Sequence, residues 1–570
     1  KKHQASMSES ASASAAAAAG ASDAPPAKRI KVRAPQRSHD YSPPIKRETD
    51  DEADVTVTGS NNAQSTASVK VEAEEDKKDI VKKEQRGGGK RAPRVRPQRR
   101  TCPYLGTVNR HLLDFDFEKL CSITLSNLHV YCCLVCGKYF QGRGKNTHSY
   151  THALEEGHYV YINLSDCNVY CLPENYLVED ASLNDIKYNL KPTYTPDEVK
   201  DLSSKRFVYG KALDGTDFIP GCIGLNDLKR TDYCNVVVQF LCQVIPLRNA
   251  LLLLDLSHKQ RPDPVLLNCS ELLRKIFNPR NFKGIVSPHE FMQAVGVASE
   301  KKFRIGQQED PLTFFVWLMN RLHAKLKDKQ TGSSVVHQCF QGDVFVKTSD
   351  VNADESVKPP EESKTPFLYL TLEVPPSPIF KDSLDRNMIP TVPIFDLLQK
   401  FDGETRHETM RGQVKRYSLW RLPPYLVFHI KRFSKNNFFL EKNPTIVTFP
   451  VKNLDLREYV HPEAQEENPV TRYDLIANVC HEGKPHDGKY RAHVLHAPSN
   501  QWYEMEDLRV TAVLPQLVAL SESYVQVYQR QDVLPDGTLD QDMRKQAMDT
   551  LLRGAGGAGG AEDDVDMFAS

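Results

Sequence analysis

Four residues between positions 133 and 158 constrain this chain more than any other feature of its sequence. Cys133 and Cys136 are separated by two residues, and His152 and His158 follow after fifteen and five further residues. Two thiolates on a tight turn and two imidazoles make up the ligands of a closed, tetrahedral zinc site. The spacing therefore predicts a small module folded around one structural Zn²⁺ ion.

Two later segments carry a second pattern. The segment from Gly224 reads Gly-Leu-Asn-Asp-Leu-Lys-Arg-Thr-Asp-Tyr-Cys-Asn, and the segment from Asp487 reads Asp-Gly-Lys-Tyr-Arg-Ala-His-Val-Leu, followed from Trp502 by Trp-Tyr-Glu-Met-Glu-Asp. These segments resemble the Cys box and His box of the ubiquitin-specific proteases, where Asn-Leu-Gly-Asn-Thr-Cys-Tyr-Met-Asn supplies the nucleophile and Gly-His-Tyr the base. The resemblance places the nucleophile, the base, the third triad member and the oxyanion-hole residue at Asp232, Lys489, Glu506 and Asp227.

None of these four side chains suits the chemistry of its position. A cysteine protease needs a thiolate, a base that titrates near neutral pH, and donors aimed at the oxyanion. Attack by Asp232 on an amide would give a high-energy anhydride, and Asp227 would repel an oxyanion. Lys489 would be protonated at pH 7 unless strongly desolvated, so it cannot act as a base. The sequence therefore predicts a degenerate cysteine protease, in which Asp232 and Lys489 form either a structural ion pair or two separately solvated side chains.

Further blocks that resemble the same family occur in the expected order, over approximately residues 221–530. They are Gln307–Asp310, Phe314–Leu318, Phe340–Gly342, Phe367–Leu372, Leu422–Phe433 and Tyr524–Tyr528. The resemblance implies an α+β, papain-like fold with a helical thumb that begins at Tyr233 and a strand-rich palm over residues 417–530. Alternating apolar residues predict palm strands at 425–433 and 524–528.

The region around the four zinc ligands resembles the UBP-type zinc finger found beside such proteases, and it keeps ligands for one zinc ion. Gln141 stands where a further Cys is usual, and an earlier Cys-x-x-Cys pair is reduced to Cys121 and Thr124. We expect His148 to be a packing or surface residue. The remaining cysteines of the module are expected to be buried thiols: Cys102, Cys121, Cys132, Cys167 and Cys171.

The protease fingers show a further departure from the family. Many members carry two Cys-x-x-Cys pairs that hold a zinc ion and grip ubiquitin, but residues 340–367 contain no cysteine. This loss argues against ubiquitin binding. The polar composition of residues 350–364 predicts a solvated loop.

Residues 1–100 have the composition of a disordered region, with an Ala/Ser tract and very few aromatic residues. Basic clusters at 28–33 and 90–100 suit nuclear-import signals or a phosphate-binding arm, with a solvated linker as the alternative. Three lysines lie in aliphatic-Lys-x-Glu tetrads and are candidate attachment sites for a ubiquitin-like modifier: Lys46, Lys70 and Lys82.

The rest of the composition fits an intracellular protein of several domains. The chain has 570 residues, no net charge and an odd number of cysteines, 13, so a disulfide framework is not expected. No apolar run approaches the length of a membrane span. We expect four parts: a disordered, basic region (1–100), a UBP-type zinc finger (101–200), an inactive protease-like domain (221–530) and a tail with an acidic end (531–570).

This combination resembles the inactive members of the family that are attached to the spliceosomal tri-snRNP. It implies a nuclear, non-catalytic scaffold that promotes spliceosome assembly in pre-mRNA splicing. The implied partners are tri-snRNP proteins, the snRNA-unwinding helicase among them, with RNA contacted indirectly or through the basic arm, and no membrane. The alternative is a ubiquitin-binding protein, or a weakly active deubiquitinase that uses a displaced thiol such as Cys234 or Cys222.

Overall fold

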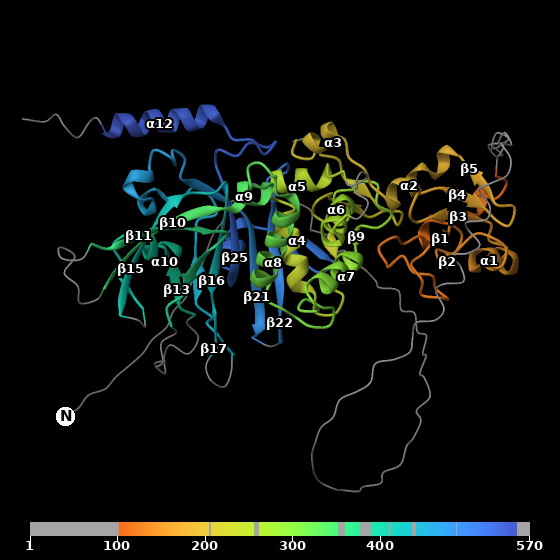
Figure 1. Ribbon diagram of the computed structural model, residues 1–570, viewed down its shortest axis with the longest axis horizontal. Coiled ribbons are helices and arrows are strands. Elements are labelled where there is room, and N and C mark those ends of the chain that lie inside the picture. Colours follow the sequence, from red (N-terminus) through yellow and green to blue (C-terminus); the bar gives the residue numbers. More distant parts are fainter. Residues whose placement is uncertain are drawn as a thin grey trace, which may run out of the picture. The chain divides into compact units, whose positions relative to one another are not determined.

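The computed structural model describes residues 102–204, 207–255, 262–350, 359–376, 389–409, 412–435, 440–485 and 487–555. These residues belong to one compact unit (Figure 1). Their mixed helix and strand content agrees with the predicted α+β class. The N-terminal basic clusters, the three candidate lysines and the acidic end lie outside the described residues. Within the described chain, no single helix has the length and apolar composition of a membrane span; only the bent pair α4 and α5 does so when taken together.

The zinc-finger region folds as a five-stranded antiparallel sheet in the order β2-β1-β3-β4-β5. Its strands are β1 (Val130–Cys133), β2 (Tyr139–Gln141), β3 (Val160–Asn163), β4 (Val169–Cys171) and β5 (Tyr176–Val178). Apolar residues of all these strands form its core. Helix α1 (His148–Glu156) joins β2 to β3, and α2 (Asn184–Leu190) and α3 (Pro196–Asp201) follow the sheet.

The thumb consists of helices packed around α4, all ten residues of which are buried. Its helices are α4 (Asp232–Leu241), α5 (Ile245–Leu252), α6 (Pro264–Ile276), α7 (His289–Ala298), α8 (Pro311–Leu326) and α9 (Val335–Phe340). Helices α6 and α8 both begin with proline, and Asp263 and Asp310 cap them by accepting hydrogen bonds from backbone N–H groups of the first turn. The first thumb helix begins one residue before the predicted Tyr233.

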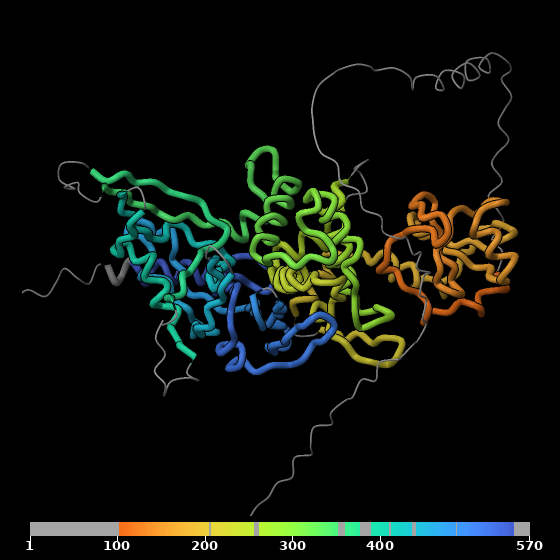
Figure 2. Tube along the Cα trace, turned by 90° about the horizontal axis from the view of Figure 1, so that it is seen from below, coloured from red at the N-terminus to blue at the C-terminus, as the bar shows by residue number. Residues whose placement is uncertain are grey.

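The palm is an eight-stranded sheet in the order β12-β16-β25-β21-β22-β23-β24, with β20 paired to β21. Its strands are β12 (Leu370–Glu373), β16 (Tyr425–Lys431), β20 (Leu454–Asp455), β21 (Arg472–Lys484), β22 (Asp487–His496), β23 (Gln501–Glu506), β24 (Arg509–Val513) and β25 (Ser523–Arg530). The two predicted palm strands are confirmed as β16 and β25, which pair with each other. The thumb helices lie against this sheet in both views, with α4 in contact with β21, β22 and β23 (Figures 1 and 2).

The fingers form a four-stranded sheet in the order β11-β10-β15-β14. Its strands are β10 (Gly342–Asp350), β11 (Glu361–Phe367), β14 (His407–Glu408) and β15 (Gln413–Arg421). The prediction of a loop over 350–364 is wrong at both ends, because Asp350 ends β10 and residues 361–364 pair with β10. Six of the seven residues of β11 are exposed, so backbone pairing rather than side-chain burial holds this strand.

The remaining elements are short and connect these layers, apart from a C-terminal helix. They are β6 (Gly210–Lys211), β7 (Asp217–Phe218), β8 (Gly224–Leu225), β9 (Ile285–Val286), β13 (Thr391–Pro393), α10 (Ile394–Leu398), β17 (Phe433–Lys435), β18 (Leu440–Lys442), β19 (Ile446–Thr448), α11 (Pro515–Ala519) and α12 (Gln541–Ala555). Strand β8 leads directly into the loop before α4, so it positions the first of the two protease-like segments.

Candidate functional site

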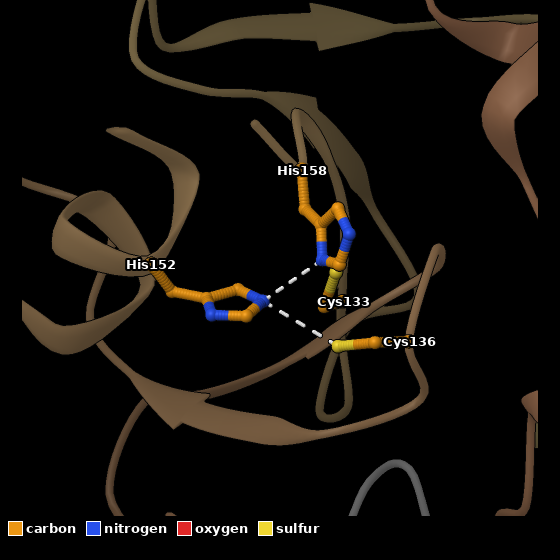
Figure 3. Close-up of side chains that lie close together, drawn as sticks. All are labelled: Cys133, Cys136, His152 and His158. Atoms are coloured by element: carbon orange, nitrogen blue, oxygen red, sulfur yellow. Dashed lines mark hydrogen bonds between the residues drawn. The ribbon is translucent and has the colours of Figure 1, made fainter. Parts of the chain in front are cut away.

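The four predicted zinc ligands come together from three parts of the finger (Figure 3). Cys133 ends β1, Cys136 lies in the turn before β2, His152 is on α1 and His158 precedes β3. The Cys136 sulfur lies 3.4 Å from His152 Nε2, which lies 3.1 Å from His158 Nδ1. All four donor atoms lie within 4.8 Å of one another.

These separations suit a tetrahedral zinc ion. Zn–S bonds of about 2.3 Å and Zn–N bonds of about 2.0 Å place neighbouring ligand atoms roughly 3.3–3.8 Å apart. The Cys133 thiol, the Lys138 backbone N–H and the two imidazoles form hydrogen bonds that lower the pKa of Cys136 to about 4, against the effect of burial. A stabilised thiolate is the form that binds zinc, so the donor set fits the metal that the sequence predicts.

The turn between Cys133 and Cys136 depends on a glycine. Gly137 has φ +75°, and a Cβ atom added there would lie 2.2 Å from the backbone oxygen of Leu112. The Gly137 N–H donates to the Cys133 carbonyl at 2.9 Å, which closes the turn. Sequence reasoning missed the role of Gly137, although a glycine directly after Cys136 indicates a turn with positive φ.

In the turn at Cys121 the sulfur atom accepts hydrogen bonds. Thr124 has a hydroxyl at the position where the family usually has a second thiol. Burial acts to raise the pKa of Cys121, but hydrogen bonds from the Thr124 side chain and from nearby backbone N–H groups lower it by more. Cys102, Cys121, Cys132 and Cys171 are buried, as expected, whereas Cys167 is only partly buried. In the described part of the chain, no second group of three or more His, Cys, Asp or Glu side chains has a metal-binding arrangement.

In the protease-like domain, Asp232 begins α4 and is only 3% exposed. Its Oδ2 atom accepts hydrogen bonds from Gln308 Nε2 at 2.7 Å and from the Tyr490 backbone N–H at 2.8 Å. Burial raises the pKa of Asp232, although these two hydrogen bonds oppose the shift. The carboxylate is therefore tied into the protein and is not presented to a substrate.

Lys489 does not pair with Asp232. Its ammonium lies 3.6 Å from Asp507 Oδ2, and its side chain is 63% exposed. The ion pair between Asp232 and Lys489 is therefore not formed, and the alternative of two separately solvated side chains is wrong for Asp232, which is buried. Sequence reasoning missed Asp507, although this carboxylate directly follows Glu506. Glu506 itself lies opposite Arg509, where β23 pairs with β24.

Asp227 closes the loop that leads into α4. Its carboxylate accepts from the Thr231 backbone N–H at 2.7 Å and from the Arg230 backbone N–H at 3.2 Å. Within this loop Lys229 and Arg230 both have positive φ, an uncommon conformation for residues with side chains. Asp227 stabilises this turn and offers no hydrogen-bond donor to an oxyanion.

A cavity of about 10 Å³ lies between α4 and the palm strands, with Asp232, Tyr490 and Asp507 in its lining. Asn235 and Gln239 of α4 also line it, and the side-chain oxygens Asp232 Oδ1, Asn235 Oδ1 and Gln239 Oε1 have no hydrogen-bond partner in the structure. A space of this size fits one water molecule, which would donate to two of the three oxygens. The position expected for the nucleophile thus adjoins a small polar cavity.

The displaced thiols are also inaccessible. Cys234 is fully buried, and burial raises its pKa well above that of a free thiol. Burial raises the pKa of Cys222 to about 12. Neither residue has the exposure or the lowered pKa of a reactive cysteine.

Comparisons with known proteins extend this description. The profile described as "Ubiquitin carboxyl-terminal hydrolase" matches residues 223–528, and that described as "Zn-finger in ubiquitin-hydrolases and other protein" matches residues 120–183. The human protein "Ubiquitin carboxyl-terminal hydrolase 39" is 48% identical over 455 residues, which cover 76% of this chain and 80% of that protein.

Two yeast proteins and one solved structure give similar matches. "Probable mRNA-splicing protein ubp10" of Schizosaccharomyces pombe is 40% identical over 75% of this chain and 88% of its own length. "Pre-mRNA-splicing factor SAD1" of Saccharomyces cerevisiae is 30% identical over 77% of this chain and 96% of its own length. The structure titled "Crystal structure of an essential yeast splicing factor" matches with a TM-score of 0.62 and 29% identity, over 75% of this chain and 99% of that one. The chain belongs to the ubiquitin carboxyl-terminal hydrolase family.

Proposed function

We propose that this chain is a non-catalytic scaffold of pre-mRNA splicing, built on a ubiquitin-protease fold. The observation that carries a role in splicing is the similarity, over about three quarters of the chain, to two yeast proteins named for splicing. The implied site of action is the nucleus, where the chain associates with the tri-snRNP and promotes spliceosome assembly. Its partners are tri-snRNP proteins, the snRNA-unwinding helicase among them, and RNA is reached through these proteins or through the basic N-terminal arm.

The geometry of the cleft supports the absence of catalysis. The side chain at the expected nucleophile position is a buried carboxylate with two hydrogen-bond donors on one oxygen. The side chain at the position of the base is an exposed ammonium beside Asp507. Four positions, Asp227, Asp232, Lys489 and Glu506, depart from the triad and oxyanion hole, so no subset of them can carry acyl transfer.

The finger is proposed to hold one structural Zn²⁺ ion through Cys133, Cys136, His152 and His158. Zinc binding supplies folding free energy to small modules of this kind. The ion would fix the turn after β1 against α1, and so maintain the surface through which the finger docks onto its partners. Substitutions that unfold the finger should therefore weaken association with the particle.

Restoring the catalytic residue types provides the test. The Asp232→Cys, Lys489→His chain should cleave a fluorogenic ubiquitin substrate only marginally, because Asp227 still donates nothing to the oxyanion. Loss of one such donor alone costs about 100- to 1000-fold in rate. In cells depleted of the endogenous protein, this variant should still support splicing, measured as intron retention.

The control in the same cells is Cys136→Ala, which should raise intron retention and reduce co-purification with tri-snRNP proteins. If the double variant is folded and intron retention rises, the cleft takes part in splicing and the proposal is wrong on that point. The deubiquitinase alternative is tested on the purified wild-type chain with a ubiquitin-based thiol probe. Labelling that disappears in Cys234→Ala would support that alternative instead.

A further inference from the structure

A buried arginine without an acidic partner lies beside a cavity in the protease-like domain. Arg248 on α5 is 5% exposed. Its Nε and Nη2 atoms donate to Asn249 Oδ1 at 3.0 and 2.9 Å, and Nη2 also donates to Ser203 Oγ at 2.7 Å. The guanidinium carbon lies 5.4 Å from the centre of the Phe277 ring. All of these neighbours are neutral, and Nη1 has no hydrogen-bond partner among the described residues.

Two other buried cations of the described chain pair with a carboxylate: Lys275 lies 3.0 Å from Asp116, and Arg530 lies 2.7 Å from Asp532. A third, Arg432, donates instead to three backbone carbonyls. No described Asp or Glu side chain lies within 4 Å of Arg248. An unpaired buried charge is costly in free energy, so this guanidinium differs from the usual pattern of buried charges.

The electrostatics of Arg248 support the same view. Burial lowers the pKa of Arg248 to about 10, and only the polar groups of Tyr425 and Cys242 oppose this shift. Burial and the charge of Arg248 together lower the pKa of His496 to about 4, so His496 is neutral at physiological pH. A negative charge placed beside Arg248 would relieve both effects.

The cavity next to Arg248 has a volume of about 40 Å³. Ser203, Gln243, His496 and Gln529 also line it, together with apolar residues and Phe277. The Ser203 hydroxyl accepts from Arg248, so its own proton is free for another acceptor. His496 Nδ1 lies 2.7 Å from Ser499 Oγ, which leaves Nε2 as a further polar atom. The lining therefore contains one cation, the Ser203 hydroxyl and no carboxylate.

We propose that this cavity binds a small oxyanion, such as inorganic phosphate, through the Nη1 group of Arg248 and the hydroxyl of Ser203. Arginine suits this role because a charged N–H donor binds an oxyanion more strongly than a neutral donor does, and its Nη1 group remains after Nε and Nη2 have donated to Asn249 and Ser203. The site lies apart from the residues Asp232 and Lys489 of the protease-like cleft. If no anion bound in this cavity, the proposed function in splicing would therefore be unaffected.

Calorimetric titration and thermal unfolding of the full-length chain test this site. Inorganic phosphate, compared with chloride at equal ionic strength, should bind with saturation and raise the unfolding midpoint. Arg248→Met should weaken phosphate binding at least tenfold, and Ser203→Ala by severalfold. Arg509→Met removes an exposed arginine and is the matched control, which should bind phosphate as the wild-type chain does.

Two further arms define the ligand. Acetate tests a planar carboxylate, and N-acetyl-phosphoserine methylamide tests a phosphate attached to a peptide; binding of inorganic phosphate without the phosphoserine compound identifies the free anion as the ligand. If Arg248→Met does not fold, Arg248→Lys and Ser203→Ala provide the comparison, and both should weaken phosphate binding. The proposal is wrong if phosphate shows no saturable binding, or if the wild-type, Arg248 and Ser203 variants bind it equally.

Discussion

At Asp232, one carboxylate oxygen receives two hydrogen bonds while the other receives none. Oδ2 accepts hydrogen bonds from Gln308 and Tyr490. Oδ1 has no partner and adjoins a cavity that Asn235 and Gln239, whose side-chain amide oxygens also have no partner, help to line. None of these three side-chain oxygens has a hydrogen-bond partner among the described residues, so an ionised Asp232 places negative charge beside two other unpartnered acceptors. An uncharged side chain of the same shape would suit this position better.

Asp232→Asn should therefore leave the folded protein as stable or stabilise it by about 1 kcal/mol at pH 7. The Asn oxygen can take the place of Oδ2 and keep both hydrogen bonds, while its amide nitrogen faces the cavity oxygens. Because the pKa of Asp232 is raised in the folded state, ionisation costs stability as the pH rises through that pKa, and stability is regained below it. The variant should lack this contribution to the pH dependence.

Urea unfolding of both proteins between pH 4 and pH 8 measures the effect. Asp217→Asn is the control, because Asp217 is exposed and should change stability little at any pH. A large loss of stability in Asp232→Asn at neutral pH would show that the negative charge itself stabilises the domain, through a water molecule or cation in the cavity.

At the scale of elements, the turn between β1 and β2 controls the zinc ligands. The backbone must pass through positive φ at Gly137, close to the Leu112 carbonyl, for Cys133 and Cys136 to face the same point. The helix α1 then brings His152 against Phe140, whose ring centre lies 4.3 Å away in a stacked arrangement. The metal site is thus built from a turn, a strand end and a helix that are near neighbours in sequence.

Gly137→Ala should disrupt this turn and reduce zinc affinity at least tenfold, because the added Cβ would overlap the Leu112 oxygen and positive φ would be strained. Elemental analysis and competition with a zinc chelator provide the measurement, with one zinc ion per wild-type chain expected. Gly106→Ala is the matched control, since an added Cβ there meets no atom within 4 Å. Two or more zinc ions per wild-type chain, or equal affinities for the two variants, would contradict this account of the finger.

Across the molecule, a buried ion pair links the segment before β1 to the thumb. Lys275 of α6 lies 3.0 Å from Asp116 and donates to the Phe115 carbonyl at 2.8 Å. The second oxygen of Asp116 accepts from the Ser287 backbone N–H at 3.0 Å. Removal of one partner would leave the other charge buried and only partly compensated.

Lys275→Met should lower the free energy of unfolding by about 3 kcal/mol. Lys283→Met provides the comparison, because the pair of Lys283 with Asp114 joins the same segments but is more exposed, and it should cost less than about 1 kcal/mol. Urea unfolding measures both values, and limited proteolysis should show faster cleavage near residue 116 in Lys275→Met alone. Equal effects of the two substitutions would mean that burial does not distinguish the pairs.

Features that depend on residue type and short spacing can be predicted from the sequence. The four candidate zinc ligands and the strands β16 and β25 follow from local patterns, because ligand chemistry and apolar alternation are legible within a few residues. The α+β class and the start of α4 follow instead from the resemblance to the ubiquitin-specific proteases. The residue types at Asp232 and Lys489 can likewise be read from the sequence, whereas their burial and their partners cannot.

The groups that compensate the charges and the backbone segments that pair become evident only in the folded protein. Asp232 is held by Gln308 and Tyr490, which lie 76 and 258 residues away along the chain, and Lys489 turns to Asp507 instead. Strand β11 was missed because its side chains are almost all exposed, so its pairing with β10 leaves no apolar pattern to read. Burial and hydrogen bonding between distant segments depend on the packed fold, and this is why Arg248, an ordinary arginine in the sequence, becomes an uncompensated charge beside a cavity.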